Sequence, residues 1–474
     1  MGTSKKTAML MLLCALGIAL GGGTARADGA PVGSDIQVAQ TLGARDLTVI
    51  MRRIDVTPGE LHVDIATHTG TAPGTLALAA AADGVVFSRG EVTLAATPGL
   101  YSGEVAVDHP GPWELRLSDG TTTATIPFVV PAQVVPPWEK AAYGGFVAAG
   151  ALLLIALAVA VRSRRTAYAL VPAGGMVAAL AVAITGALLS TGTPPPPAPG
   201  AQLDATVDNV TDPYALSRLP VTDYSRPPVN FTVQHQNTER PGLDLHFTDG
   251  STGRPADDLV IHDDALVHLI VVSPSGRLWH LHPVRVAPGT YHVAFTPPEA
   301  GTYAVAAELE RRGGGVQLAR STVDLTTTGH TTAEIPAGPG KRVINGTPID
   351  ITTTPIQAGT PVTITVHFPT GDLQPWLGML GHLVVVGPLP SDADVGAAAA
   401  TAPTWAHAHA MPPYVPGLTG VPDETVNAYG PDVPFTYTFA TPGRYRLWLQ
   451  AERGWSVLTV PVALDVPAAP GGGS

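Results

Sequence analysis

Apolar and polar residues alternate in short runs over most of this chain, and two long apolar runs interrupt the alternation. The segment Leu61-His-Val-Asp-Ile-Ala is one example, with an apolar side chain at every second position. A period of two is that of a β-strand with one buried face. Turn signals such as Asp83-Gly84 separate these runs. The pattern therefore predicts a mainly β protein built from short strands.

Three regions end in a similar sequence: a Gly, an aromatic residue, an alternating strand, a turn and a final strand. The aromatic residues are Trp113, Tyr303 and Tyr445. An aromatic residue at such a corner is typical of immunoglobulin-like sandwiches. We therefore expect three Ig-like β-sandwiches, the last two being divergent repeats of one another. Their predicted bounds are 28–136, 207–328 and 342–466.

The two apolar runs, residues 141–161 and 168–189, carry no charge. At 1.5 Å per residue, each can cross a hydrocarbon core of about 30 Å as a helix. The short connection between them is basic, with Arg162, Arg164 and Arg165, which places it in the cytoplasm by the positive-inside rule. We therefore predict a transmembrane helical hairpin within residues 138–190.

The remaining segments predict export. Residues 1–27 combine Lys5 and Lys6, an apolar run and the sequence Ala25-Arg-Ala27, which is typical of a cleaved signal peptide. A Pro-rich linker is expected at 191–206 and a flexible tail at 467–474. With the hairpin, these features predict a cell-membrane protein with both large soluble regions on the extracytoplasmic side.

Composition excludes several kinds of chemistry. The net charge of −12 makes nucleic acid an unfavourable partner. The single Cys, Cys14, lies inside the predicted signal peptide. Disulfides, Cys-ligated zinc, iron–sulfur clusters and blue copper are therefore excluded. The sequence also has no nucleophile elbow, phosphate-binding loop or His-Glu-x-x-His motif, so we do not expect an enzyme.

A histidine pattern occurs once in each of the last two regions. One His precedes an apolar run, and a His-x-His follows on the next run. Residues i and i+2 of a strand point to the same side, so two imidazoles can converge on one ion, and a third can join from the neighbouring strand. We therefore predict two transition-metal sites. Their candidate ligands are His268, His280 and His282 in the first, and His382, His407, His409 and Met411 in the second.

The two predicted sites differ in chemistry. Met411 and the nearby Met379 would add thioether ligation to the second, which favours Cu(I). The first is purely imidazole, with His262, His292 and Glu308 as further candidates, which suits Cu(II) or zinc.

Two other hypotheses compete with metal binding. Duplication copies packing histidines as faithfully as ligands, so the domains could be structural modules that bind an envelope protein or polymer. The small residues Gly174-Gly175-Met-Val-Ala-Ala would also allow close helix packing in a larger membrane assembly.

The sequences Trp279-His-Leu-His-Pro, Gly381-His-Leu-Val-Val-Val and Pro442-Gly-Arg-Tyr-Arg-Leu-Trp-Leu-Gln resemble bacterial exported proteins of the YtkA-like type. These are Ig-like domains akin to the CopC copper-resistance proteins. The resemblance covers residues 257–466. It implies an exported sandwich that handles copper or another heavy metal. This chain departs from the family pattern at Ala410, where Pro is expected, and in a long insert before His407.

Overall fold

A computed structural model provides the structure of the protein. The described residues are 35–130, 137–191, 227–327, 329 and 335–469, with gaps at 53, 55–56, 164, 237–239, 313, 391–393, 414–421 and 423. The predicted signal peptide lies outside the described residues, as do the predicted Pro-rich linker beyond Thr191 and most of the predicted tail.

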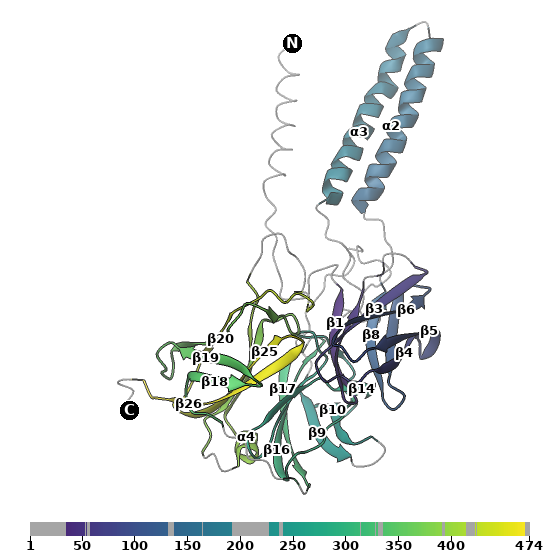
Figure 1. Ribbon diagram of the computed structural model, residues 1–474. Helices are drawn as coiled ribbons and strands as arrows, with labels where there is room; N and C mark the ends of the chain where they lie inside the picture. Colours follow the sequence, from purple (N-terminus) through teal and green to yellow (C-terminus); the bar gives the residue numbers. More distant parts are fainter. Residues whose placement is uncertain are drawn as a thin grey trace. The chain divides into compact units, whose positions relative to one another are not determined.

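The first sandwich packs two four-stranded sheets, β1-β2-β3-β6 and β5-β4-β7-β8, around an apolar core (Figure 1). Its strands are β1 (Ile36–Leu42), β2 (Arg45–Met51), β3 (Gly59–Thr67), β4 (Gly74–Ala82), β5 (Val85–Leu94), β6 (Gly99–Val107), β7 (Gly111–Ser118) and β8 (Thr123–Val130). The corner residue Trp113 is buried and donates from Nε1 to the carbonyl of His109 at 3.0 Å.

The second sandwich packs the sheet β14-β15-β10-β9 against the sheet β11-β16-β12-β13, with β17 pairing to β16. Its strands are β9 (Val229–Gln236), β10 (Gly242–Asp249), β11 (Leu259–Val260), β12 (His268–Val272), β13 (Leu278–Leu281), β14 (Val284–Ala287), β15 (Thr290–Val293), β16 (Gly301–Arg311) and β17 (Gly315–Leu325).

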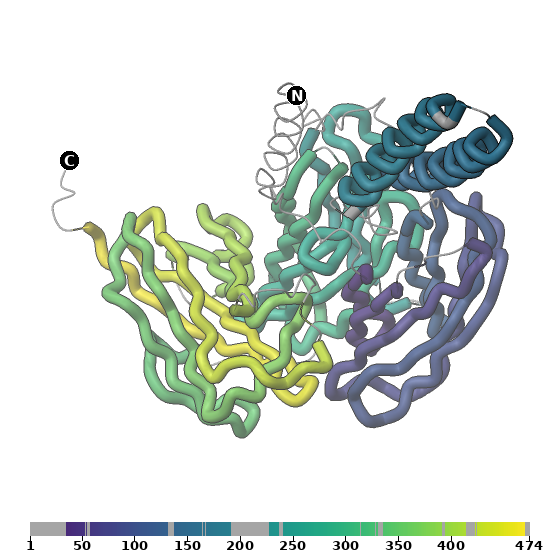
Figure 2. Tube along the Cα trace, turned by 90° about the horizontal axis from the view of Figure 1, so that it is seen from above, coloured from purple at the N-terminus to yellow at the C-terminus, as the bar shows by residue number. Residues whose placement is uncertain are grey.

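The third sandwich repeats this arrangement with the sheets β18-β19-β20-β24 and β21-β25-β22-β23, and β26 pairs to β25 (green to yellow in Figure 2). Its elements are β18 (Gly340–Ile344), β19 (Thr347–Thr353), β20 (Pro361–His367), β21 (Leu373–Gln374), β22 (Gly381–Gly387), α4 (Val395–Ala400), β23 (Thr404–Ala410), β24 (Asp432–Thr438), β25 (Gly443–Arg453) and β26 (Ser456–Val466). Tyr303 and Tyr445 donate to carbonyls four residues upstream in their own sandwiches, as Trp113 does.

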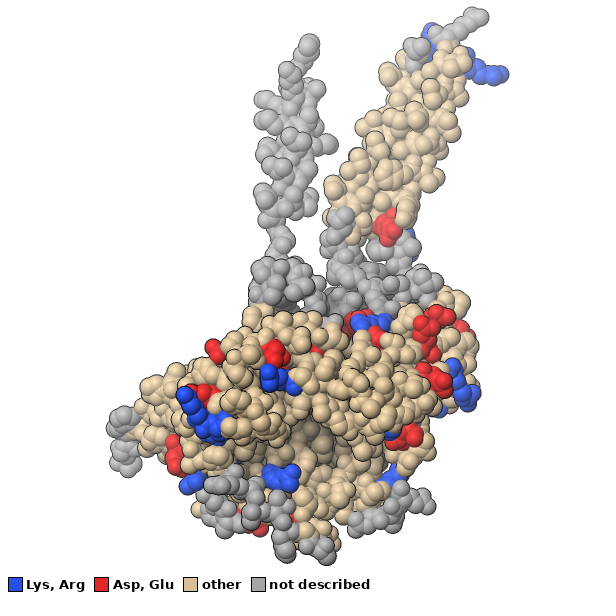
Figure 3. Space-filling view, viewed as in Figure 1, with Lys and Arg blue, Asp and Glu red and all other residues tan. Residues whose placement is uncertain are grey.

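Two apolar helices lie between the first and second sandwiches in the chain. They are α2 (Pro137–Arg162) and α3 (Leu170–Thr191), and the 3₁₀ turn η1 (Thr166–Ala169) precedes α3. Both are long and apolar enough to cross a membrane, and their surface in Figure 3 is almost free of charge along its length. They pack closely where Gly145 of α2 meets Ala183 and Gly186 of α3 meets Ala142. Gly174, which the sequence singled out, has no neighbour at that distance. The predicted fold class, Ig-like sandwiches with a helical pair, is confirmed.

Strand alternation explains how the second and third sandwiches contact each other. In β12, Leu269 and Val271 belong to the core of their own sandwich, while Ile270 and Val272 point away from it into a separate apolar cluster. In β22 the same division separates Leu383 and Val385 from Val384 and Val386. A strand that is apolar on both faces is typically buried on both faces. The second cluster is therefore the contact between the two sandwiches.

The insert of the third sandwich also joins this contact. The sequence showed no strand pattern over residues 391–404, and the described part holds the short helix α4. Asp394 caps this helix through the amide of Ala397 at 2.9 Å, and the Val395 amide donates to the carbonyl of Pro274 in the second sandwich at 2.9 Å. A Cβ on Gly396 would lie 2.1 Å from the Thr302 carbonyl oxygen, so α4 lies directly against β16.

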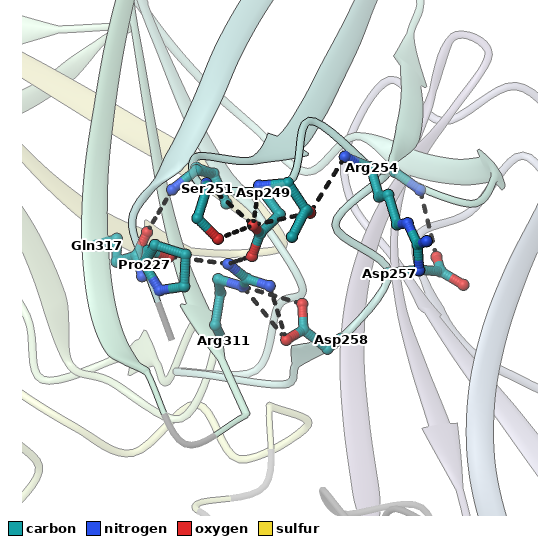
Figure 4. A network of polar contacts seen from close by, with 11 residues as sticks. Pro227, Asp249, Ser251, Arg254, Asp257, Asp258, Arg311 and Gln317 are labelled. Atoms are coloured by element: carbon teal, nitrogen blue, oxygen red, sulfur yellow. Dashed lines mark hydrogen bonds and ion pairs between the residues drawn. The ribbon is translucent and has the colours of Figure 1, made fainter. Parts of the chain in front are cut away.

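The second sandwich also contains a buried ion-pair network at the end of β16 (Figure 4). Arg311 donates from Nη1 to Asp249 at 2.8 Å and from Nε to Asp258 at 3.0 Å. Arg311 is first among the groups that hold the pKa of Asp249 well below its usual range. The network holds the turn after β10 against β16, so the contacts of Arg311 serve the stability of the fold.

Candidate metal centre

All six predicted histidines lie in one cluster between the second and third sandwiches. The two predicted ligand sets are therefore in contact with each other. The strand face that carries Ile270 also carries His268, and the face that carries Val384 also carries His382. Ring centroids of the two copies approach to 5.3 Å for His268–His407, 5.4 Å for His280–His382 and 5.0 Å for His280–His407. The cluster is therefore a continuation of the contact between the sandwiches.

The first copy brings His268 and His280 together as neighbours on paired strands. His268 Nδ1 lies 3.1 Å from His280 Nε2. His268 Nε2 lies 3.1 Å from the carbonyl of His262, and His280 Nδ1 lies 3.0 Å from Gln450 Oε1. Gln450 donates through its own Nε2 to Thr459, so its oxygen is the atom offered to His280.

The backbone carbonyl of His262 fixes one tautomer, because a carbonyl oxygen can only accept a hydrogen bond, so His268 carries its proton on Nε2. With the Gln450 amide oriented so that Oε1 faces His280, His280 carries its proton on Nδ1. The two nitrogens that face each other at 3.1 Å, His268 Nδ1 and His280 Nε2, are then both lone-pair atoms. Such a pair is repulsive unless a cation lies between them. Metal–imidazole bonds of about 2.0–2.1 Å place ligand nitrogens roughly 3 Å apart.

The second copy places its rings in the same way, although no hydrogen bond to His407 Nδ1 sets the tautomer of that ring. His382 Nε2 lies 3.1 Å from the carbonyl of Trp376, and its Nδ1 lies 3.2 Å from His407 Nε2. His407 Nδ1 lies 3.5 Å from Glu308 Oε1 of the second sandwich, an ion-pair distance rather than a good hydrogen bond. Glu308 and Gln450 occupy matching places, since they pair in register with His268 and His382 respectively. Each copy thus places a polar side chain behind a histidine of the other, as a hydrogen-bond partner in the case of Gln450 and at an ion-pair distance in the case of Glu308.

Burial keeps these rings neutral. His268, His280 and His382 are at most 6% exposed. Burial, with repulsion from neighbouring histidines, lowers the pKa of each of these three well below 6.5. The pKa of His409 falls to about 4 for the same two reasons. A proton is therefore not available at neutral pH to relieve the facing lone pairs, whereas neutral imidazole is the form that binds metals.

The outer histidine of each His-x-His has at least one ring nitrogen without a hydrogen-bond partner. His282 is 1% exposed, and neither of its ring nitrogens has one; its nearest carboxylate is Asp46 of the first sandwich, at 3.9 Å. His409 Nε2 is likewise buried without a partner. Unpaired buried polar atoms are rare in folded proteins, and they often mark the place of an ion or a water molecule.

The geometry yields two sets of three histidines whose donor atoms lie within 4.8 Å of one another. They are His268, His280 and His282, and His280, His382 and His407. His280 belongs to both. A set of exposed residues in the first sandwich, Glu60, His62 and Glu104, meets the same distance criterion, although the sequence suggested no site there.

Three other candidates lie elsewhere. Met411 follows the end of β23 and is 64% exposed, so it does not belong to the buried cluster. Met379 is buried in the turn before β22, where it forms a bridge with Trp376. His292 lies on the opposite sheet and pairs with Asp244 at 2.7 Å. A purely imidazole centre replaces the expected mixed one.

Sequence reasoning missed two functional neighbours, Gln450 and Trp376. Gln450 was a polar residue in an apolar strand, Tyr-Arg-Leu-Trp-Leu-Gln, and it lies on the same strand face as Trp448. The Trp376 ring centroid lies 4.7 Å from that of His382 and 5.0 Å from that of His280. The contacts of Gln450 and Trp376 with His280 join the two sandwiches, so no local pattern in the sequence indicates them.

Comparisons with known proteins give limited information. A domain of unknown function, DUF8832, matches residues 342–468, which are the third sandwich. No curated protein matches the chain. Among solved structures, a tetra-tandem repeat from the extending region of a large adhesion protein is 12% identical, covers 91% of this chain and 74% of its own, and has a TM-score of 0.17.

Two further structures show similarity of the same kind. A segment of two fibronectin type III domains from chicken tenascin is 13% identical, covers 51% of this chain and all of its own (100%), and has a TM-score of 0.14. A Ca²⁺-stabilized, ice-binding adhesin of an Antarctic bacterium is 9% identical, covers 87% and 70%, and has a TM-score of 0.15. At these scores none of the three bears on function.

Proposed function

We propose that this chain is a membrane-anchored, extracytoplasmic protein that binds a transition-metal ion at the six-histidine cluster and sequesters or delivers it without catalysis. The observation that carries the proposal is the facing pair His268 Nδ1 and His280 Nε2, together with the buried ring nitrogens of His282 and His409 that lack hydrogen-bond partners. These atoms lie among buried neutral rings, which favours a cation as the missing partner.

The ligand set favours copper(II), with zinc as the alternative ion. Every described donor in the buried cluster is an imidazole, and imidazole suits both metals. Divalent copper binds a given nitrogen site more tightly than zinc in the general order of affinities. Since Met411 is remote, the thioether basis for Cu(I) is lost. The resemblance to YtkA-like and CopC-like proteins points to the same metal.

The sidedness of the protein belongs to this proposal. The predicted signal peptide and the basic connection between α2 and α3 together favour placing the sandwiches outside the cytoplasm. A metal centre without Cys is suited to that oxidising compartment, because imidazole is not consumed by oxidation as a thiolate is.

The test is metal analysis of the full chain, purified in detergent, before and after titration with Cu²⁺. The informative variant is His280→Gln with His407→Gln, which removes one histidine from each facing pair. The matched control is His367→Gln, an exposed histidine of the third sandwich that pairs with Asp432. We expect the wild type and the control to bind Cu²⁺ with equal stoichiometry and the double variant to lose tight binding.

Two outcomes would overturn the proposal. One is a wild-type chain that binds neither Cu²⁺ nor Zn²⁺, and the other is a folded double variant with unchanged stoichiometry. In either case the histidines would serve packing, and the sandwiches would be better described as interaction modules of the envelope.

A further inference from the structure

The two ends of the six-histidine cluster differ although the repeats that build it are alike. In each repeat a tight turn begins six residues before the first histidine. An isolated antiparallel β-bridge closes this turn, between His262 and Ala265 in the second sandwich and between Trp376 and Met379 in the third. In the third sandwich this turn closes the cluster. Trp376 is 2% exposed and Leu377 is 0% exposed.

The matching turn of the second sandwich carries polar groups instead. His262 Nε2 lies 3.1 Å from Asp263 Oδ2 and 3.8 Å from Glu308 Oε1, and its Nδ1 lies 3.5 Å from Glu310 Oε2. The side chains of His262, Asp263 and Glu308 are 24%, 23% and 14% exposed. Their donor atoms all lie within 4.8 Å of one another. This trio, His262, Asp263 and Glu308, is termed the outer site.

The outer site makes direct contact with the buried cluster. Asp263 Oδ2 lies 3.6 Å from His409 Nδ1, and Glu308 Oε1 lies 3.5 Å from His407 Nδ1. The His407 side chain is 3% exposed, and its Nδ1 has no hydrogen-bond partner although it faces the outer site. The exposed fraction of the side chain falls from 24% at His262 to 16% at His409 and 3% at His407.

We propose that His262, Asp263 and Glu308 form a second cation site, which loads a divalent transition metal and passes it by way of His409 to the buried histidines. The inference rests on the proposed function of the buried cluster. Mixed imidazole and carboxylate donors suit a partly hydrated Cu²⁺ or Zn²⁺. Two carboxylates also draw cations from solution. Transfer exchanges ligands only, so no electron or covalent bond is involved.

One other carboxylate approaches the cluster, and it supplies the matched control. Asp46 of the first sandwich lies 3.9 Å from His282 Nδ1. Strand β1, which pairs with the strand of Asp46, lies against His282, because Thr41 Oγ1 accepts a hydrogen bond from the His282 amide at 3.0 Å. If any nearby negative charge promoted loading, Asp46 would be as effective as Asp263.

The experiment follows Cu²⁺ binding to the full chain in stopped flow by quenching of tryptophan fluorescence. Trp376 lies against His280 and His382 and reports arrival at the buried cluster, and Trp376→Phe identifies its share of the signal. We expect His262→Gln with Asp263→Asn to slow association at least about tenfold. We expect Asp46→Asn to leave the rate unchanged. Dissociation should slow in parallel, so the equilibrium Kd of the buried ion stays constant.

The outcomes separate this inference from the function on which it rests. Unchanged association in the His262 and Asp263 double variant, with normal binding at equilibrium, overturns the loading site and leaves the buried metal site standing. A weakened Kd with unchanged association also overturns it, since the two residues would then only support the fold. Absence of saturable quenching in the wild type overturns both.

Discussion

His280 of the second sandwich and Gln450 of the third are hydrogen-bonded, with Nδ1 3.0 Å from Oε1. The contact means that one sandwich holds the ring orientation of a candidate ligand from the other. A partner behind a metal-binding histidine typically changes metal affinity by 10–100-fold when it is removed.

Replacing Gln450 by Leu should therefore weaken Cu²⁺ binding by about 10- to 100-fold, because His280 loses the acceptor that keeps its Nε2 free. Gln450→Glu retains an acceptor at the same place and should bind at least as tightly as the wild type. Isothermal titration against a competing chelator measures both. Equal affinity in the Leu and Glu variants would show that Gln450 does not orient the ring.

The contact between the second and third sandwiches should depend on Trp448. Its ring is 1% exposed, and its Nε1 donates to the carbonyl of Gly276 in the second sandwich at 3.1 Å. Trp448→Ala should cost about 3–5 kcal/mol in the free energy of unfolding, through lost burial and a cavity. Chemical denaturation measures this cost. The companion Trp138→Ala, in an exposed position at the start of α2, should leave the stability of the sandwiches unchanged.

The helix pair should separate when its close contact is filled. A Cβ on Gly145 would lie 2.8 Å from the backbone nitrogen of Ala183, whereas a Cβ on Gly150 meets nothing within 4 Å. Gly145→Leu should therefore push α2 from α3, while Gly150→Leu should be tolerated. Cross-linking between cysteines placed on the two helices, measured in bilayers, distinguishes them. Equal cross-linking in both variants would contradict the observed packing.

The first and third sandwiches should separate more easily at alkaline pH. His68 Nδ1 lies 2.8 Å from Glu452 Oε1, and both residues are buried. Burial alone would lower the pKa of His68, but the hydrogen bond and charge of Glu452, with the charges of Asp46 and Glu424, outweigh it and raise the pKa to about 9.

A raised pKa means that the folded state holds the proton more tightly than the unfolded state, where the pKa of His68 is near 6.5. The stabilisation is fully present below pH 6.5 and is lost as the pH rises through 9. We expect up to about 3 kcal/mol to disappear over that window. Thermal melts from pH 6 to 10 would show the slope, and His68→Gln should abolish it, while His62→Gln, an exposed pair with Glu104, should not.

Several elements followed from local patterns. The apolar span predicted at 141–161 lies within α2, and the span predicted at 168–189 begins in η1 and continues along α3. The corner aromatics Trp113, Tyr303 and Tyr445 take the expected place because an aromatic ring buries well and can still donate to a nearby carbonyl. The helix α4 in the insert has only six residues, too few to show a helical period in the sequence.

The sequence by itself determined the strand faces, and with them which histidines share a side. His280 and His282 point together because side chains alternate along a strand, and the same holds for His407 and His409. That rule is local and needs no partner.

Only the tertiary structure decided that the two histidine sets meet. The apolar runs beginning at His268 and His382 are buried on both faces, but a sequence does not say what covers the second face. In this protein the second and third sandwiches cover the outer faces of each other's strands β12 and β22. The hydrogen bond from His280 to Gln450 joins residues 170 positions apart. The contacts of Asp263 with His409 and of Glu308 with His407 also join the two sandwiches, and no local period encodes such contacts.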